Sequence, residues 1–137
     1  MYHTIILIGN LGRDPELRYI PSGQAVTTLN VASNRNYKGS DGEMVKETIW
    51  FRVSVWGKQA ETVSQYLHKG SKVLVEGRLQ PDPASGGPRL WTDKEGNTRA
   101  SFEVTASTVR FLSSKGEGGG MGEDGEMPAG GEEEIPF

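Results

Sequence analysis

Residues 48–58 read TIWFRVSVWGK, and the alternation in this stretch decides the fold that we predict for the chain. The run is short and rich in β-branched and aromatic residues, which is typical of a half-buried strand. Successive side chains of a strand point to opposite faces. One face of Thr48–Lys58 would carry four apolar side chains, Ile49, Phe51, Val53 and Val55. We therefore expect that face to lie in a hydrophobic core.

The other face of this predicted strand combines aromatic and positively charged side chains. It would carry Trp50, Arg52, Ser54, Trp56 and Lys58. Indole planes beside fixed positive charges suit flat rings attached to phosphates, which is the chemistry of unpaired nucleic acid. The alternative is that Trp50 and Trp56 cover a second core or a subunit contact, and the pattern alone leaves both interpretations open.

Size and composition indicate one ordinary domain. The chain has 137 residues and no cysteine, which excludes a disulfide scaffold and a thiolate zinc site and fits a reducing cytosol. The N-terminal MYHTIILIGNLG lacks the basic region and cleavage site of a secretory signal, and its apolar run is too short to span a membrane. We expect a soluble, cytoplasmic protein associated with the nucleoid.

The net charge of −3 conceals a division of charge along the chain. Residues 1–112 hold 14 Lys and Arg against 11 Asp and Glu, whereas residues 113–137 hold one Lys against seven acids. Such asymmetry indicates a basic binding body that is followed by an acidic tail.

Four further strand patterns accompany the central one. They are Thr4–Asn10, Ala25–Ser33, Lys72–Leu79 and Arg99–Leu112, the last with a bulge near Ser107 where the apolar parity changes. The first strand is apolar on both faces, so one face needs cover from this chain or from another subunit. A short extended piece is expected at Glu16–Ile20.

One helix and two long loops complete the predicted domain. Apolar residues at helical spacing predict a helix over Gln59–Lys69, which Gly70 ends. We expect a polar loop at Asn34–Lys46, and an extended loop or hairpin at Pro81–Asn97 that turns near Glu95-Gly96-Asn97. Five strands with one helix between the third and the fourth predict an all-β, five-stranded OB-fold barrel over residues 1–112, which binds oligonucleotides on one face and through its longer loops.

The predicted nucleic-acid site extends from the two-faced strand onto these loops. Tyr37 and Trp91 would add aromatic rings from the two loops. Phosphates would meet Arg52 and Lys58 on the strand, Arg35 and Lys38 in the first loop, Lys72 and Arg78 near the fourth barrel strand, and Arg89 before Trp91. For Lys38 or Arg78 alone, a solvated surface charge is the better interpretation.

The tail has two predicted parts. Residues 113–131 are rich in Gly and Glu without apolar periodicity, so they cannot bury enough surface to offset ordering entropy and are expected to be disordered. The tip is Glu132, Glu133, Glu134, Ile135, Pro136 and Phe137. An apolar end with a free carboxylate and three acids suits an apolar pocket rimmed by Arg or Lys on a partner protein. The alternative is a solubilising tail, and the same tail could also compete with DNA for the basic groove, weakly and in a salt-dependent way.

Nothing in the sequence indicates an enzyme. His3 and His68 lie far apart without metal-ligand spacing, and no phosphate-binding Gly-x4-Gly-Lys-Ser/Thr loop occurs. The GxGxxG match at residues 120–125 follows no strand and opens no helix. We expect no catalytic residues, no metal and no cofactor.

The chain contains, in order, the segments IILIGNLGRDPELRY, PSG, ETIWFRVSVWGKQAE, YLHKGSKVLVEGRL, WTDKEGN and EEEIPF. This ordered set resembles the bacterial single-stranded DNA-binding proteins. The resemblance implies a homotetramer of OB-fold domains that wraps single-stranded DNA, with partner proteins of replication, recombination and repair docking on the tip. It places stacking aromatics at Trp50, Trp56 and Trp91, and at Tyr37, where the family often has Trp.

Three departures from the family pattern are visible. Trp56 stands where Phe is common, Pro81–Pro88 looks like an insertion, and the tip has Glu where Asp is usual. The remaining alternatives are a specialised plasmid or phage paralogue, a primosomal OB-fold protein, and an OB-fold adaptor that binds other proteins. A nuclease has little support.

Overall fold

A computed structural model describes residues 1–113 of the chain. Its elements, in chain order, are β1 (Ile5–Leu11), β2 (Glu16–Tyr19), β3 (Ala25–Lys38), β4 (Met44–Trp56), α1 (Lys58–Tyr66), β5 (Lys72–Leu79), β6 (Arg89–Thr92) and β7 (Thr98–Phe111). The predicted linker, apart from Ser113, and the whole predicted tip lie outside the described residues.

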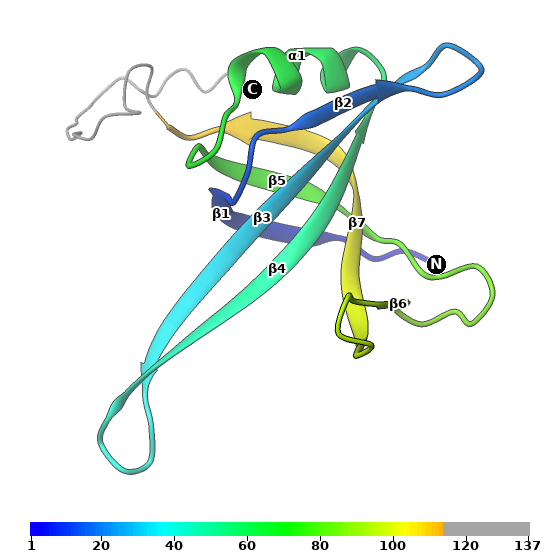
Figure 1. The fold of residues 1–137 in the computed structure, drawn as a ribbon. Coiled ribbons are helices and arrows are strands. Elements are labelled where there is room, and N and C mark those ends of the chain that lie inside the picture. The colour runs from blue at the N-terminus through cyan, green and yellow to red at the C-terminus, as the bar shows by residue number, and fades with distance from the viewer. Residues whose placement is uncertain (114–137) are drawn as a thin grey trace.

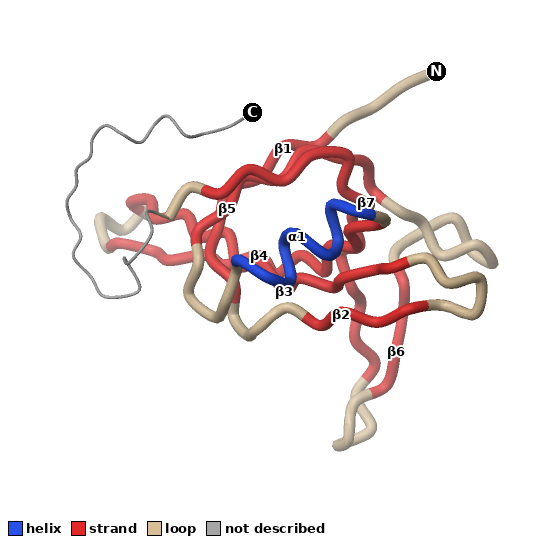
Figure 2. The backbone as a smooth tube through the Cα atoms, turned by 90° about the horizontal axis from the view of Figure 1, so that it is seen from above, coloured by secondary structure: helices blue, strands red, loops and turns tan. Residues whose placement is uncertain are grey.

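Five of the strands close into a barrel (Figures 1 and 2). The sheet runs in the order β1-β5-β7-β4-β3, and pairing of β1 with β3 completes the circle. All neighbours are antiparallel except β4 and β7, which run parallel. Among residues 1–113 there is one α-helix, α1, which follows the third barrel strand and lies across one end of the barrel (Figure 2). The predicted five-stranded OB-fold barrel is thus confirmed.

The core is filled by the inward faces of these strands. Phe51, Val53 and Val55 of β4 are buried among valines and leucines from β1, β3, β5 and β7, as the alternation in the sequence predicted. The helix contributes Ala60 and Val63, which close the end of the barrel. Each fully buried aliphatic side chain contributes about 1.5–3 kcal/mol relative to its exposed state.

The prediction of a loop over Asn34–Lys46 is wrong, because most of this segment is strand. Pairing of β3 with β4 continues out to Lys38 opposite Met44, and only residues 39–43 form a turn, where Gly39 N–H donates to the Glu43 carbonyl (2.8 Å). The two strands project from the barrel as a ribbon (Figure 1). Water surrounds both faces of such a ribbon, so its sequence lacks the apolar alternation that marks a half-buried strand.

The same projection explains Ile49, which we expected in the core. Ile49 is exposed although it shares its parity with buried Phe51. The core face of β4 begins at Phe51, and Ile49 lies on the part of the strand that leaves the barrel. Parity gives the face of a residue and does not say where the barrel ends.

The placement of Lys58 on the strand is also wrong. Strand β4 ends at Trp56, Gly57 turns the chain with a left-handed φ of 74°, and Lys58 is the first residue of α1. Alternation therefore does not carry Lys58 onto the face of the indoles. The positive φ at Gly57 is the reason, because it interrupts the extended backbone that parity requires.

The helix is shorter than predicted. It ends at Tyr66, and Leu67 is already extended, with φ −101° and ψ 154°. The Ser71 Oγ accepts the backbone N–H of His68 (3.0 Å), so the chain turns away three residues before Gly70. The predicted helix end at Lys69, and with it the terminal position of His68 and Lys69 in a helix, is corrected accordingly.

Two finer predictions are confirmed. Glu76 pairs with Thr108 and Gly77 with Ala106, which leaves Ser107 as the extra residue of a bulge. Residues 89–101 form the β6–β7 hairpin, whose turn contains Gly96 with φ 85°. No helix among residues 1–113 is long and apolar enough to cross a membrane.

Candidate nucleic-acid interface

The outer face of β4 carries the predicted aromatic track. Trp50 is 53% exposed and Trp56 39% exposed, and both point away from the core. They stand six residues apart on one strand, which is about 20 Å at 3.3 Å per residue. The alternative in which both indoles fill a core is excluded for the single chain.

A groove of about 420 Å³ opens beside Trp50. The β6–β7 hairpin brings Trp91 and Arg89 to it from a part of the sequence some forty residues later, and Arg52 of β4 and Arg13 of the β1–β2 connection also line it. Two indoles and three guanidiniums thus share one concave surface. Such a surface offers planar rings that can stack on bases and guanidiniums that can bind phosphate.

Glu103 of β7 holds two of these guanidiniums. It is only 9% exposed, its Oε1 lies 3.2 Å from Arg52 Nη1, and its Oε2 lies 3.8 Å from Arg89 Nη1. Ser101 donates its hydroxyl to the same Oε2 (2.6 Å). One carboxylate between two guanidiniums leaves a net positive charge, and each guanidinium has five N–H donors, so donors remain for phosphate.

Gly12 sets the position of the first indole. A Cβ built on Gly12 would lie 2.5 Å from a ring carbon of Trp50. The indole therefore lies against the bare backbone at this point. Any larger residue at position 12 would push the ring aside.

The turn of the β6–β7 hairpin is organised by Asp93. Its carboxylate accepts hydrogen bonds from Arg99 Nε (2.8 Å) and from the backbone N–H groups of Asn97 (2.9 Å) and Glu95 (3.0 Å). The hydrogen bond from Arg99 is the main cause of a lowered pKa of Asp93. Because the pKa of Asp93 is lower in the folded chain than in the unfolded chain, the ionised carboxylate stabilises the turn at pH values above the unfolded pKa. This stabilisation is lost as the pH falls through the folded pKa.

The cations of the ribbon lie apart from the groove. Arg35 Nε lies 3.7 Å from Glu47 Oε2, and Arg35 Cζ lies over the Tyr37 ring, 4.6 Å from its centroid. Lys38 is the last residue of β3 and is exposed. Tyr37 is partly exposed but already has one cation over its ring, which the sequence could not indicate.

Two more predicted cations lie on other strands of the barrel surface. Lys72 pairs across strands with Asn10, Asn10 with Ala32, and Ala32 with Trp50. Lys72 is therefore three strand spacings from Trp50, which is about 14 Å at 4.8 Å per spacing. Arg78 pairs with Thr105, and Thr105 pairs with Ser54, so Arg78 is about 10 Å from the outer face of β4. The structure therefore brings together Trp50, Trp91, Arg52 and Arg89, and it leaves Trp56, Tyr37, Arg35, Lys38, Lys58, Lys72 and Arg78 outside the groove.

Three residues that line the groove or contact its lining side chains were missed by the sequence reasoning. Arg13 and Gly12 belong to a segment that the pattern indicates only as a turn, and Glu103 is one acid within an apolar run. The isolated acid was the available signal, because a carboxylate in a strand that packs on a core needs a cationic partner. No group of three or more potential metal ligands occurs among residues 1–113.

Comparisons with known proteins agree with this geometry. The model of the single-strand binding protein family matches residues 2–112. The single-stranded DNA-binding protein of Wolinella succinogenes is 45% identical over 126 residues, which is 90% of this chain and 74% of that protein. The Helicobacter hepaticus protein of the same name is 44% identical over 118 residues, which is 86% of this chain and 65% of that protein.

A solved structure shows the same fold. A deletion mutant of the single-stranded DNA binding protein from Thermus aquaticus superposes with a TM-score of 0.62 at 32% identity, over 84% of this chain. This chain spans about half of the Thermus chain, 51%. With the family model covering nearly the whole described barrel, the chain belongs to the single-strand binding protein family.

Proposed function

We propose that this chain binds single-stranded DNA without sequence preference and without catalysis. The main support for the proposal is the groove that Trp50, Trp91, Arg52 and Arg89 line together. Stacking of a base on an aromatic ring contributes about 1–3 kcal/mol and tolerates any sequence, because every base has a π-face. The relatives named as single-stranded DNA-binding proteins support the same ligand.

The strand would continue beyond the groove in this proposal. Trp56 would offer a further ring along β4, and Tyr37 another on the ribbon. The remaining cations would neutralise phosphates along the way; they are Arg35, Lys38, Lys58, Lys72 and Arg78. Duplex DNA keeps its bases stacked inside the helix, so indoles on an open surface discriminate for unpaired strands.

Titration of the intrinsic tryptophan fluorescence tests this function. We expect strong quenching by oligo-dT and a weak response to a duplex of the same length. Each phosphate contact should add about −0.7 to the slope of log K against log salt, so the two paired guanidiniums of the groove alone predict about −1.4. An adaptor that binds only proteins, which is the second candidate, would show no quenching by either DNA at any salt concentration.

A homotetramer is proposed from the outer face of β1. Ile6 is 59% exposed and Ile8 is 46% exposed, side by side on one face of the strand. Neighbouring exposed isoleucines on a regular strand suit a subunit contact better than solvent. We propose that residues 1–112 form the DNA-binding and assembly domain of each subunit, in the cytoplasm with the nucleoid.

Partner recruitment is proposed for the end of the chain. Residues 113–131 would act as a linker, and Glu132–Phe137 as the tip that docks proteins of replication, recombination and repair. Deleting Glu132–Phe137 should leave oligo-dT affinity unchanged or tighter, since an acidic competitor is removed. The same deletion should abolish capture of those proteins on immobilised chain. A large loss of DNA affinity measured by titration would contradict this division of roles.

A further inference from the structure

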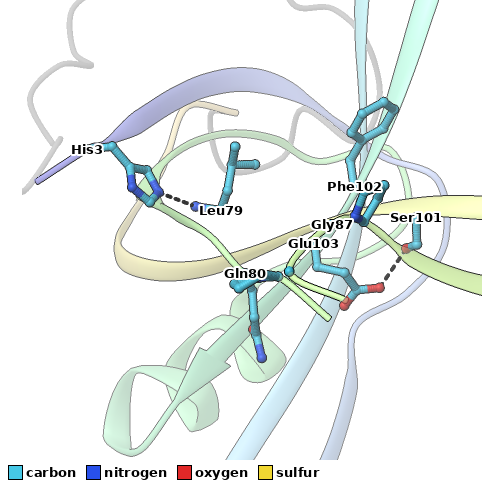
Figure 3. A pocket seen from close by; sticks show the side chains of 10 residues that line it. His3, Leu79, Gln80, Gly87, Ser101, Phe102 and Glu103 are labelled. Atoms are coloured by element: carbon cyan, nitrogen blue, oxygen red, sulfur yellow. Dashed lines mark hydrogen bonds between the residues drawn. The ribbon is translucent and has the colours of Figure 1, made fainter. Parts of the chain in front are cut away.

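A second pocket, of about 400 Å³, lies next to the groove. It is lined by Leu79–Pro81 and Gly86–Pro88, by His3 near the N-terminus and by Phe102 of β7 (Figure 3). Its volume falls in the range of small-molecule sites. The proposed function so far assigns nothing to this pocket or to the Pro81–Pro88 segment.

The walls of the pocket are held in place by hydrogen bonds within the chain. Asp82 N–H donates to the Gly87 carbonyl (2.8 Å), and Gly86 N–H donates to the Asp82 carbonyl (2.8 Å), so the segment is a closed turn. On the opposite side, His3 Nε2 accepts the backbone N–H of Leu79 (3.0 Å), as Figure 3 shows. A pocket formed before its ligand arrives loses little entropy on binding.

Phe102 gives the pocket an aromatic surface. It shares the inward parity of Val104, but it lies where the barrel ends and is 51% exposed. Its ring has one aromatic neighbour, Phe51, tilted by 50° with the centroids 6.0 Å apart. The exposed remainder of the ring suits a flat, largely apolar ligand.

The pocket and the groove adjoin each other. Ser101 lines both of them. Phe51 lines the groove while its ring contacts Phe102 of the pocket. Glu103 lines the pocket and pairs with Arg89 of the groove (3.8 Å), so a guanidinium stands at the junction.

We infer that the Phe102 pocket binds one more nucleobase of the strand that occupies the groove, stacked on the Phe102 ring. This inference rests on the proposed function, and it assigns the Pro81–Pro88 segment a role as one wall of a base-binding position. An apolar peptide side chain would also suit the ring. The residue shared with the groove, Ser101, and the Arg89 guanidinium beside Glu103 favour a base that is attached to phosphate.

Phe102→Ala in the full chain tests the inference with oligo-dT of stepwise length. Affinity should fall by about 5- to 150-fold, the value of one lost stacking contact, for oligonucleotides long enough to reach from the groove into the pocket. Shorter oligonucleotides should bind as they bind to the wild type. Tyr66→Ala is the matched control. Like Phe102, Tyr66 is exposed (61%) and its ring packs at a tilt against another aromatic ring, that of Phe111, with the centroids 6.4 Å apart. It should cause no loss at any length.

Photocrosslinking of iodouracil-substituted oligonucleotide to the unmodified chain provides a test without a substitution. The inference predicts a cross-link at Phe102. It is overturned if Phe102→Ala matches the wild type at every length and no cross-link forms there. It is equally overturned if light scattering shows that Phe102→Ala dissociates an oligomer, since the pocket would then be a subunit contact. Lack of oligo-dT binding by the wild type would instead refute the proposed function itself.

Discussion

Replacing Trp50 and Trp91 together by alanine should weaken oligo-dT binding by about 2–6 kcal/mol, because two stacking partners of about 1–3 kcal/mol each are removed from one groove. The two indoles line the same surface, so their effects need not add, and single substitutions should accompany the pair. Both side chains are substantially exposed. The barrel core is therefore expected to remain intact in the double variant.

The small number of tryptophans in the chain makes this experiment straightforward to interpret. It contains three tryptophans, so the double variant keeps Trp56 as its one indole reporter. Affinity is best measured by anisotropy of a labelled oligo-dT, while quenching of Trp56 shows whether DNA still passes along β4. Circular dichroism and the thermal midpoint serve as folding controls. Affinity within threefold of the wild type would contradict the assignment of the groove as the main stacking surface.

The sequence predicts the barrel correctly at the positions whose side chains are buried in its core. The parity of Phe51, Val53 and Val55 gave the core face of β4, and a change of apolar parity gave the bulge at Ser107. In these places burial imposes a pattern on the side chains, so the pattern reports the structure. On the β3–β4 ribbon no face is buried, and strand could not be told from loop.

The groove was predictable only in part. Trp50 and Arg52 follow from one strand, and Trp91 was predicted from its place in a long loop of the expected OB-fold and again from the family resemblance. The coupling of Arg52 to Arg89 through Glu103 joins β4 to the β6–β7 hairpin, which comes much later in the chain. The contact of Trp50 with Gly12 likewise joins two distant segments. Such contacts depend on strand order and register, which local patterns do not contain.

Closure of the barrel is what brings these distant segments together, and it depends on glycine at points of close strand approach. Gly77 lies at the bulge, where β5 crosses β7. A Cβ at this position would overlap the backbone carbonyl oxygen of Thr105. Backbone cannot rotate away as a side chain can, so the strands themselves would have to separate.

Gly77→Ala should therefore destabilise the barrel by about 1–3 kcal/mol or more, which corresponds to a fall in thermal midpoint of roughly 4–8 °C per kcal/mol for a small domain. Gly87→Ala is the matched control. A Cβ built on Gly87 would have Ser85 Oγ as its nearest neighbour, at 3.7 Å, and Gly87 is not among the glycines with positive φ. Alanine there should therefore leave stability unchanged or raise it by about 0.4–1 kcal/mol. Thermal unfolding of both variants at one protein concentration measures the difference. Equal midpoints would show that β5 and β7 approach less closely at Gly77 than described, and that the groove does not depend on this crossing.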